Sequence, residues 1–105
     1  MDLDDLKQQL AHFAAERDWE QYHTPKNLAM ALSVEVSELV EIFQWLTPEQ
    51  STIIMETEEK EHVEEELADI LIYLIRLADK LGVDLAAAVD SKIEKNGEKY
   101  PAGKV

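Results

Sequence analysis

Residues 67–77 read LADILIYLIRL, a helical stretch in which apolar side chains cover nearly every side of the helix. A helix that is apolar all round is buried all round. Because a chain of 105 residues cannot easily surround one of its own helices, this pattern favours a second subunit that covers part of the surface. The alternative is a helix that lies at the centre of a single chain.

The flanking sequence predicts further helices on both sides of this stretch. Thr24 and Thr47, each followed by proline, and Asp84 are expected N-caps, and Gly82 is an expected C-cap. No segment reads as a strand. The sequence therefore predicts one all-α domain over residues 1–105, a four-helix-type antiparallel bundle that is oligomeric. Its main helices are expected over residues 3–17, 25–46, 58–81 and 84–97, with a short helix after Thr47.

Composition limits the classes of function. Hydrophobic residues make up 46% of the chain, which indicates a folding sequence and not a disordered acidic tail. A formal net charge of −13 argues against binding a nucleic acid through its phosphates. Cysteine is absent, so disulfides and thiol chemistry are excluded. No apolar run is long enough to span a bilayer and no signal peptide is visible, so we expect no membrane and a cytoplasmic location.

The charge is unevenly distributed along the chain. Residues 34–69 hold twelve acidic residues and one base, whereas residues 91–105 hold four lysines and two acids. One interpretation is a solvated acidic surface with a basic tail. The other is a metal site in the middle of the chain and a phosphate clamp near its end.

Two acid pairs have helical spacing. Glu35 and Glu38 lie three apart beside an apolar stripe, and Glu66 and Asp69 repeat that spacing just before the apolar stretch. Buried carboxylates are costly, and several together would repel one another. A divalent cation would relieve both costs, and oxygen ligands without His or Cys suit Mg²⁺ or Mn²⁺. Glu41, one turn beyond Glu38, could extend the row.

The spacing alone is a weak indication, because glutamate is abundant in helices. Seven glutamates lie between Glu56 and Glu66, and most of them fit a solvated helix face. The second pair on a separate helix is what favours a metal site over chance.

The order of the motifs resembles a known family. E-V-S-E, a spacer of 27 residues and then E-L-A-D is similar to the E-x-x-E…E-x-x-D signature of the all-α, MazG-like nucleoside triphosphate pyrophosphohydrolases. Three longer blocks resemble the dCTP pyrophosphatase branch of that family: FAAERDWEQYHTPKNLAMALSVEVSELVEIFQW, EEELADILIYLIRLA and SKIEKNGEKYP. The resemblance to that branch implies a preference for deoxynucleotides, with dCTP or a cytosine analogue first. The sequence departs from the branch in a shorter segment between the acid pairs and in a short C-terminus, and both departures count against a strict dCTP preference.

This resemblance implies a Mg²⁺-dependent enzyme that hydrolyses a nucleoside triphosphate between its α and β phosphates. The products would be a monophosphate and pyrophosphate, and the assembly a homodimer or homotetramer. By position, Glu35, Glu38, Glu66 and Asp69 would be the metal ligands. Glu38 is the first choice for a general base and Glu35 the second, although the sequence does not separate ligand from base.

The resemblance also implies residues for phosphate and base. Phosphate contacts would come from Lys92, Asn96, Lys99 and Tyr100, and base contacts from Trp19, His23, Trp45 and Tyr73. Each set has a plainer interpretation. The lysines could complement the dipole of the last helix, a tryptophan at a helix end could be a core lid, and His23 could be an ordinary loop residue. His12 and His62 are interpreted as surface residues.

Two other functions remain open at this point. A di-iron or di-manganese carboxylate bundle would need E-x-x-H pairs, and the second pair here is E-x-x-D. A non-enzymatic acidic helical module that binds a partner protein would leave the aligned Lys92, Asn96 and Tyr100 unexplained.

Overall fold

The computed structural model describes residues 1–103, so Lys104 and Val105 of the lysine-rich C-terminal segment lie outside the described residues. Within residues 1–103 the chain is helical and contains no strand, which confirms the all-α prediction. The elements are α1 (Leu3–Glu16), α2 (Pro25–Phe43), α3 (Pro48–Thr52), the 3₁₀ helix η1 (Ile54–Glu56), α4 (Lys60–Leu81) and α5 (Leu85–Lys99).

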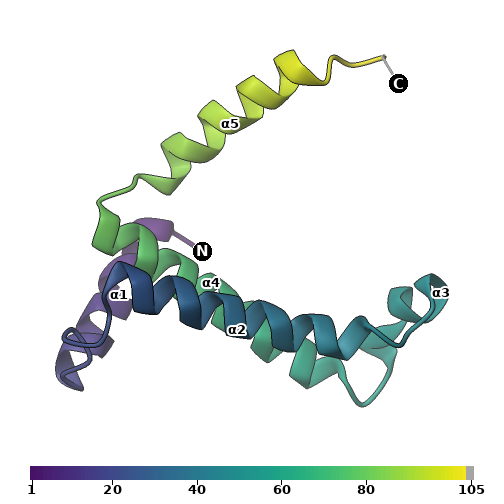
Figure 1. The fold of residues 1–105 in the computed structure, drawn as a ribbon, viewed down its shortest axis with the longest axis horizontal. Helices are drawn as coiled ribbons and strands as arrows, with labels where there is room; N and C mark the ends of the chain where they lie inside the picture. Colours follow the sequence, from purple (N-terminus) through teal and green to yellow (C-terminus); the bar gives the residue numbers. More distant parts are fainter. Residues whose placement is uncertain (104–105) are drawn as a thin grey trace.

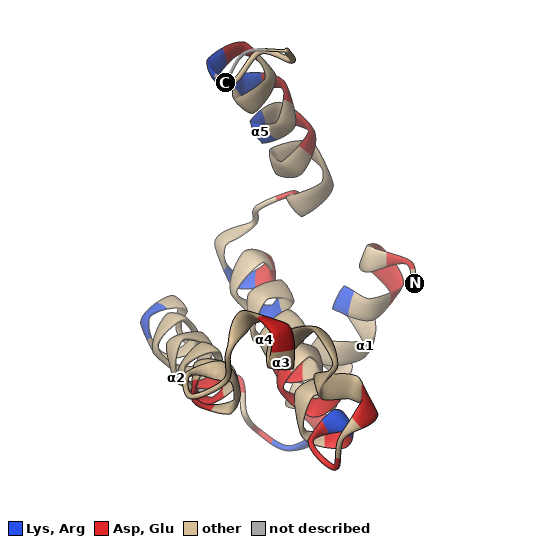
Figure 2. Ribbon diagram, turned by 90° about the vertical axis from the view of Figure 1, so that its right-hand side faces the viewer, with Lys and Arg blue, Asp and Glu red and all other residues tan. Residues whose placement is uncertain are grey.

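The core lies along α4. Helix α2 packs antiparallel against it, and α1 packs across its second half (Figure 1). Leu28 of α2, Ala14 of α1 and Ile75 of α4 are almost fully buried where these helices meet. The acidic residues gather around α3 and the beginning of α4, whereas lysines lie on α5 (Figure 2).

Local sequence signals set the helix ends. Thr24 and Asp84 cap α2 and α5 through their side chains, and Thr47 forms a capping box with Gln50 at the start of α3. Gly82 ends α4 in the left-handed conformation with a φ of 68°. These four signals were predicted from the sequence, and the structure confirms them.

Several boundaries differ from the predicted ones. Helix α2 ends at Phe43, before the turn that leads into the Thr47 cap, and α4 begins at Lys60. Helix α5 continues through Gly97 to Lys99, because glycine inside a helix costs only about 1 kcal/mol. It stops before Pro101, whose ring disfavours helical geometry at the preceding Tyr100.

Helix α5 extends away from the other helices (Figure 1). None of its residues is buried, and Val89 and Ile93 are 53% and 63% exposed. The helices that pack together within one chain are therefore α1, α2 and α4. No helix within residues 1–103 is long and apolar enough to cross a membrane.

Candidate metal centre

Three carboxylates converge between α2 and α4. Each of Glu35, Glu38 and Glu66 places one oxygen so that all three oxygens lie within 4.8 Å of one another. Helix periodicity puts Glu35 and Glu38 on the same face of α2, and the antiparallel packing brings Glu66 of α4 opposite them. The arrangement joins residues that are 31 positions apart in the sequence, from Glu35 to Glu66.

Two oxygens of this cluster are buried without a hydrogen-bond donor. They are Oε2 of Glu35 and Oε2 of Glu66, and the Glu66 residue is only 7% exposed. Ionised carboxylates can only accept hydrogen bonds, so neither group can satisfy the other unless one is protonated. The Glu66 carboxyl and burial raise the pKa of Glu35 to about 7, and the charges of Glu38 and Asp69 add to the rise. A cation would replace the missing donors.

Asp69 lies beside the cluster. It is not among the three residues whose oxygens converge, but it is close enough for its charge to contribute to the raised pKa of Glu35. Glu41 is exposed and lines a neighbouring cleft. The four acids that the sequence analysis expected as metal ligands, Glu35, Glu38, Glu66 and Asp69, therefore lie close together in space.

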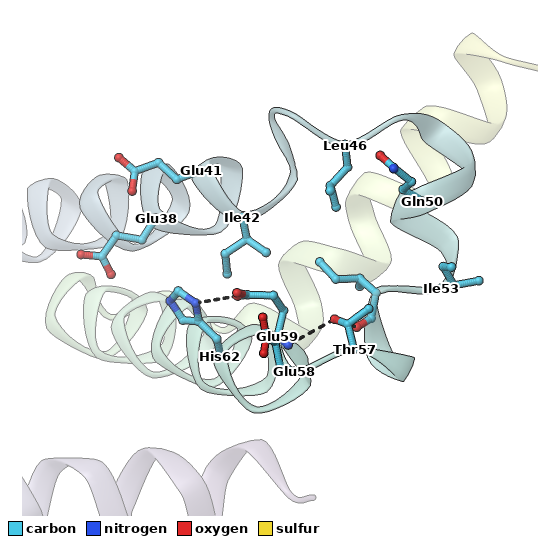
Figure 3. A pocket seen from close by; sticks show the side chains of 11 residues that line it. Glu38, Glu41, Ile42, Leu46, Gln50, Ile53, Thr57, Glu58, Glu59 and His62 are labelled. Atoms are coloured by element: carbon cyan, nitrogen blue, oxygen red, sulfur yellow. Dashed lines mark hydrogen bonds and ion pairs between the residues drawn. The ribbon is translucent and has the colours of Figure 1, made fainter.

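A cleft of about 860 Å³ opens next to the cluster. It runs from Glu38 along the end of α2, over α3 and η1, to the first turn of α4. Figure 3 shows Glu38 on α2 facing the α4 side of the cleft, which His62 in the first turn of α4 and its N-cap Glu59 also line. The walls combine apolar side chains, such as Ile42 and Leu46, with carboxylates. The cleft therefore gives solvent and a small ligand access to one member of the carboxylate cluster.

His62 is a neighbour of the cluster that the sequence analysis treated as a surface residue. Its side chain is 52% exposed, but its Nε2 lies 3.6 Å from Oε1 of Glu66 and its Nδ1 lies 3.1 Å from Oε2 of Glu59. The distance to Glu66 is longer than a hydrogen bond, so His62 is a neighbour of this buried carboxyl and not a hydrogen-bond partner of it. The signal was the four-residue spacing from His62 to Glu66, which puts both on one helix face.

The residues nominated for phosphate lie apart from the acids within one chain. Lys92, Asn96, Lys99 and Tyr100 are all exposed and all belong to α5 or its C-cap. Because α5 extends away from α2 and α4, a single chain does not bring these donors to the carboxylate cluster (Figure 1).

Three of the four residues expected to contact the base lie at the two ends of α2, and the fourth lies on α4. Trp19 and His23 lie in the connection before α2, with ring centroids 6.0 Å apart. Trp45 follows its C-terminal end and is 85% exposed. The 19 residues of α2 separate the two sites by about 28 Å at 1.5 Å per residue. Tyr73 is partly buried on α4, one turn after Asp69.

The sequence profile of the MazG-like family matches residues 30–105, which include both acid pairs. The chain therefore belongs to the MazG-like family, and the resemblance seen in its motifs is confirmed.

Individual relatives narrow the comparison. The chain is 50% identical to dCTP pyrophosphatase 1 of Homo sapiens over 101 residues, and 48% identical to that of Rattus norvegicus over 100 residues. These matches cover 95% and 94% of this chain, which spans 59% of the length of each relative. The crystal structure of a pyrophosphatase from Archaeoglobus fulgidus superposes with a TM-score of 0.87 at 46% identity. That match covers 93% of this chain and 91% of the archaeal one.

Proposed function

We propose that this chain is a Mg²⁺-dependent nucleoside triphosphate pyrophosphohydrolase. It would convert a (d)NTP and water into a (d)NMP and pyrophosphate, with a preference for deoxynucleotides such as dCTP. The observation that carries the proposal is the convergence of Glu35, Glu38 and Glu66, with two buried oxygens that lack donors. The similarity to dCTP pyrophosphatase 1 over nearly the whole chain supports the substrate class.

The residues present fit a hard divalent cation. Glu35, Glu38, Glu66 and Asp69 offer only oxygen atoms, which suit Mg²⁺, with Mn²⁺ as an alternative. When bound, the cation supplies positive charge against the triphosphate and polarises a water molecule.

The side chains of this protein would divide the remaining work. Glu38 lines the cleft, so its carboxylate is accessible to take a proton from the attacking water. Glu35 does not line the cleft and is the second candidate for that role. Glu66 and Asp69, on the facing helix, hold the other side of the cluster. The lysines, Asn96 and Tyr100 of the α5 segment offer N–H and O–H donors to phosphate oxygens.

The proposal includes at least a homodimer, and a homotetramer is the larger alternative. Within one chain the α5 donors and Trp45 lie away from the groups with which they should act. A second copy that packs against the open face of α4 would cover exposed Leu67 and Leu74 and bring further side chains to the cleft.

Pyrophosphate release from each dNTP in the presence of Mg²⁺ tests the proposal directly. We expect Glu38→Gln to keep the fold and to lose turnover by about 10²-fold or more, because one charge leaves the cluster while the shape is preserved. The matched control is Glu64→Gln, which removes an exposed carboxylate from α4 outside the cluster. Wild-type activity in Glu38→Gln, Glu35→Gln and Asp69→Asn together would refute the site.

Comparison of kcat/KM for dCTP, dTTP, dATP, dGTP and CTP tests the base preference. We expect dCTP or a cytosine analogue to rank first and CTP to be used less well. A purine preference, or equal use of CTP and dCTP, would overturn the preference and leave pyrophosphohydrolysis intact. Failure to release pyrophosphate from any nucleotide would favour a non-enzymatic interaction module. Redox activity with iron would favour a di-metal oxidase.

A further inference from the structure

Arg76 is a buried charge that the proposed chemistry does not use. It lies on α4, two turns beyond Asp69, and is only 3% exposed. A guanidinium remains charged at any ordinary pH, and burial of a charge is costly unless its donors are all engaged. Its partners therefore indicate what the residue does.

Those partners lie mostly in the connection between α1 and α2. The Nη2 of Arg76 donates to Oε1 of Glu20 at 2.7 Å, and its Nε donates to Nδ1 of His23 at 3.3 Å. Its Nη1 donates to Asp79 on its own helix at 3.3 Å. Lys80 pairs with the second oxygen of Glu20. One residue of α4 thus holds two side chains that are 53 and 56 positions away in the sequence.

The contact with Arg76 determines which nitrogen of His23 carries the proton. Arginine has donors and no acceptor, so the Nδ1 that faces it must offer a lone pair. The ring is then neutral, with its hydrogen on Nε2. Protonation of Nδ1 would set two N–H groups against each other beside a fixed positive charge.

The charges and the burial around His23 also favour its neutral form. Burial lowers the pKa of His23 below its ordinary value of 6.5, and the positive charge of Arg76 lowers it further. Lys80 also lowers this pKa, whereas the carboxylate of Glu20 raises it. Asp79 is the remaining carboxyl partner of Arg76. The balance favours a neutral ring at pH 7.

The other nitrogen of His23 is available to a ligand. Within residues 1–103 no hydrogen bond involves Nε2, and it is not among the buried atoms that lack a partner, so solvent reaches it. Trp19, 42% exposed, presents a flat ring beside it, with the centroids 6.0 Å apart. An aromatic face next to an N–H donor is what a nucleobase requires, since the base stacks through its face and is read through its edge.

We propose that Arg76 is a positioning residue that fixes His23 as the neutral tautomer with its proton on Nε2, so that this ring donates a hydrogen bond to an acceptor on the nucleotide base. The inference rests on the proposed function, because it presupposes a nucleotide ligand. It adds the direction of the hydrogen bond and the residue that imposes it. A base with a donor in place of that acceptor would be disfavoured.

Long-range ¹H–¹⁵N spectra of the histidine rings in the nucleotide-free protein test the tautomer. His23→Gln identifies the signals of His23. We expect a neutral ring with its proton on Nε2 at pH 7 and a titration midpoint below 6.5. A wild-type ring that carries its proton on Nδ1, or that is charged at pH 7, would overturn the proposal. This measurement requires no variant of Arg76 to fold.

Arg76→Met then removes both the donor and the charge while it keeps an unbranched apolar side chain. We expect the His23 midpoint to rise, because the pull of Glu20 remains, and the ring to exchange between its two tautomers. The matched control is Asp79→Asn, which alters another partner of Arg76 and leaves the His23 contact in place. An unchanged tautomer in a folded Arg76→Met protein would contradict the assignment.

Steady-state kinetics link the tautomer to the nucleotide. Arg76→Met should raise KM for the preferred nucleotide by about fivefold, the value of one hydrogen bond, with kcat nearly unchanged. If the His23 ring exchanges between tautomers in Arg76→Met but KM is unchanged, the role of His23 in base recognition is overturned. If wild-type protein hydrolyses no nucleotide, the proposed function fails, and the role at the base fails with it. The ring spectra still decide whether Arg76 fixes the tautomer, so the two failures are distinguishable.

Discussion

At the scale of single residues, Glu35 and Glu66 bring two carboxyl groups to a place where water does not solvate both. Each keeps one buried oxygen without a donor. Without a cation, the free energy of unfolding depends on the protonation of these carboxyl groups. With a cation bound, it depends on the cation concentration. Stability measured against pH and Mg²⁺ therefore reports on the site directly.

The pH dependence of the metal-free protein has a definite sign. The pKa of Glu35 is raised from 4.5 to about 7 in the folded state, by the Glu66 carboxyl first and then by burial. A raised pKa contributes stability that is fully present below the unfolded pKa and is lost as pH rises through the folded one. We expect the metal-free melting temperature to fall between about pH 4.5 and 7, and Mg²⁺ to restore it at neutral pH.

Thermal scans of Glu35→Gln test whether Glu35 is the source of this pH dependence. The substitution should flatten the pH dependence of the metal-free protein and reduce the rise in melting temperature with Mg²⁺. Glu64→Gln, on the exposed side of α4, should behave as wild type. A pH profile that is identical in wild type and Glu35→Gln would show that the carboxyl pair is not the source.

At the scale of elements, the C-terminal ends of α1 and α4 use the same motif with different residues. Helix α4 ends at Gly82 with a φ of 68°, and α1 is followed by Asp18 with a φ of 56°. After α1, Trp19 donates to the carbonyl of Ala14 and Asp18 to that of Ala15, the bonds of a Schellman motif. Glycine takes this conformation freely, whereas aspartate is strained in it.

A reciprocal pair of substitutions tests this account of the helix ends. Gly82→Ala should destabilise the protein by about 1 kcal/mol, and Asp18→Gly should leave its stability unchanged or raise it by up to about that amount. Steric crowding does not contribute to the effect of Gly82→Ala, because a Cβ placed at Gly82 meets no atom of a neighbouring group within 4 Å. Chemical denaturation measures both. Gly97→Ala is the control, because Gly97 lies inside α5 and does not have a positive φ. Equal destabilisation by Gly82→Ala and Asp18→Gly would contradict the conformational argument.

At the scale of the whole molecule, one chain leaves much apolar surface uncovered. Leu67 and Leu74 of α4 are 52% and 38% exposed, whereas Ile75 is 2% exposed. The valines of α2 and Val89 and Ile93 of α5 are also open. Large exposed apolar patches mark interfaces, so the packing supports the proposed oligomer.

Two aspartate substitutions separate assembly from folding. Leu74→Asp should split the oligomer and leave a helical monomer, because the side chain is exposed within one chain. Ile75→Asp should unfold the protein, because it buries an unpaired charge between helices of the same chain. Light scattering and circular dichroism measure the two effects. A wild-type protein that is monomeric at micromolar concentration would contradict the assembly.

The sequence by itself determined the helices and most of their ends. Thr24, Thr47, Gly82 and Asp84 act on backbone groups within a few residues, so their effect could be predicted without a fold. The spacing of the acid pairs also fixed which carboxylates share a helix face. The spacing alone left two interpretations, a metal site or a solvated helix face. The resemblance to the MazG-like family favoured the metal site.

Only the tertiary structure decided which distant groups meet. The antiparallel packing of α2 on α4 brings Glu66, one of many nearby glutamates, opposite Glu35 and leaves two carboxyl oxygens without donors. It also brings Arg76 to His23 across 53 positions and leaves α5 apart from the acids. Local rules could not give these results, because such contacts depend on how whole helices pack and on the burial of charge.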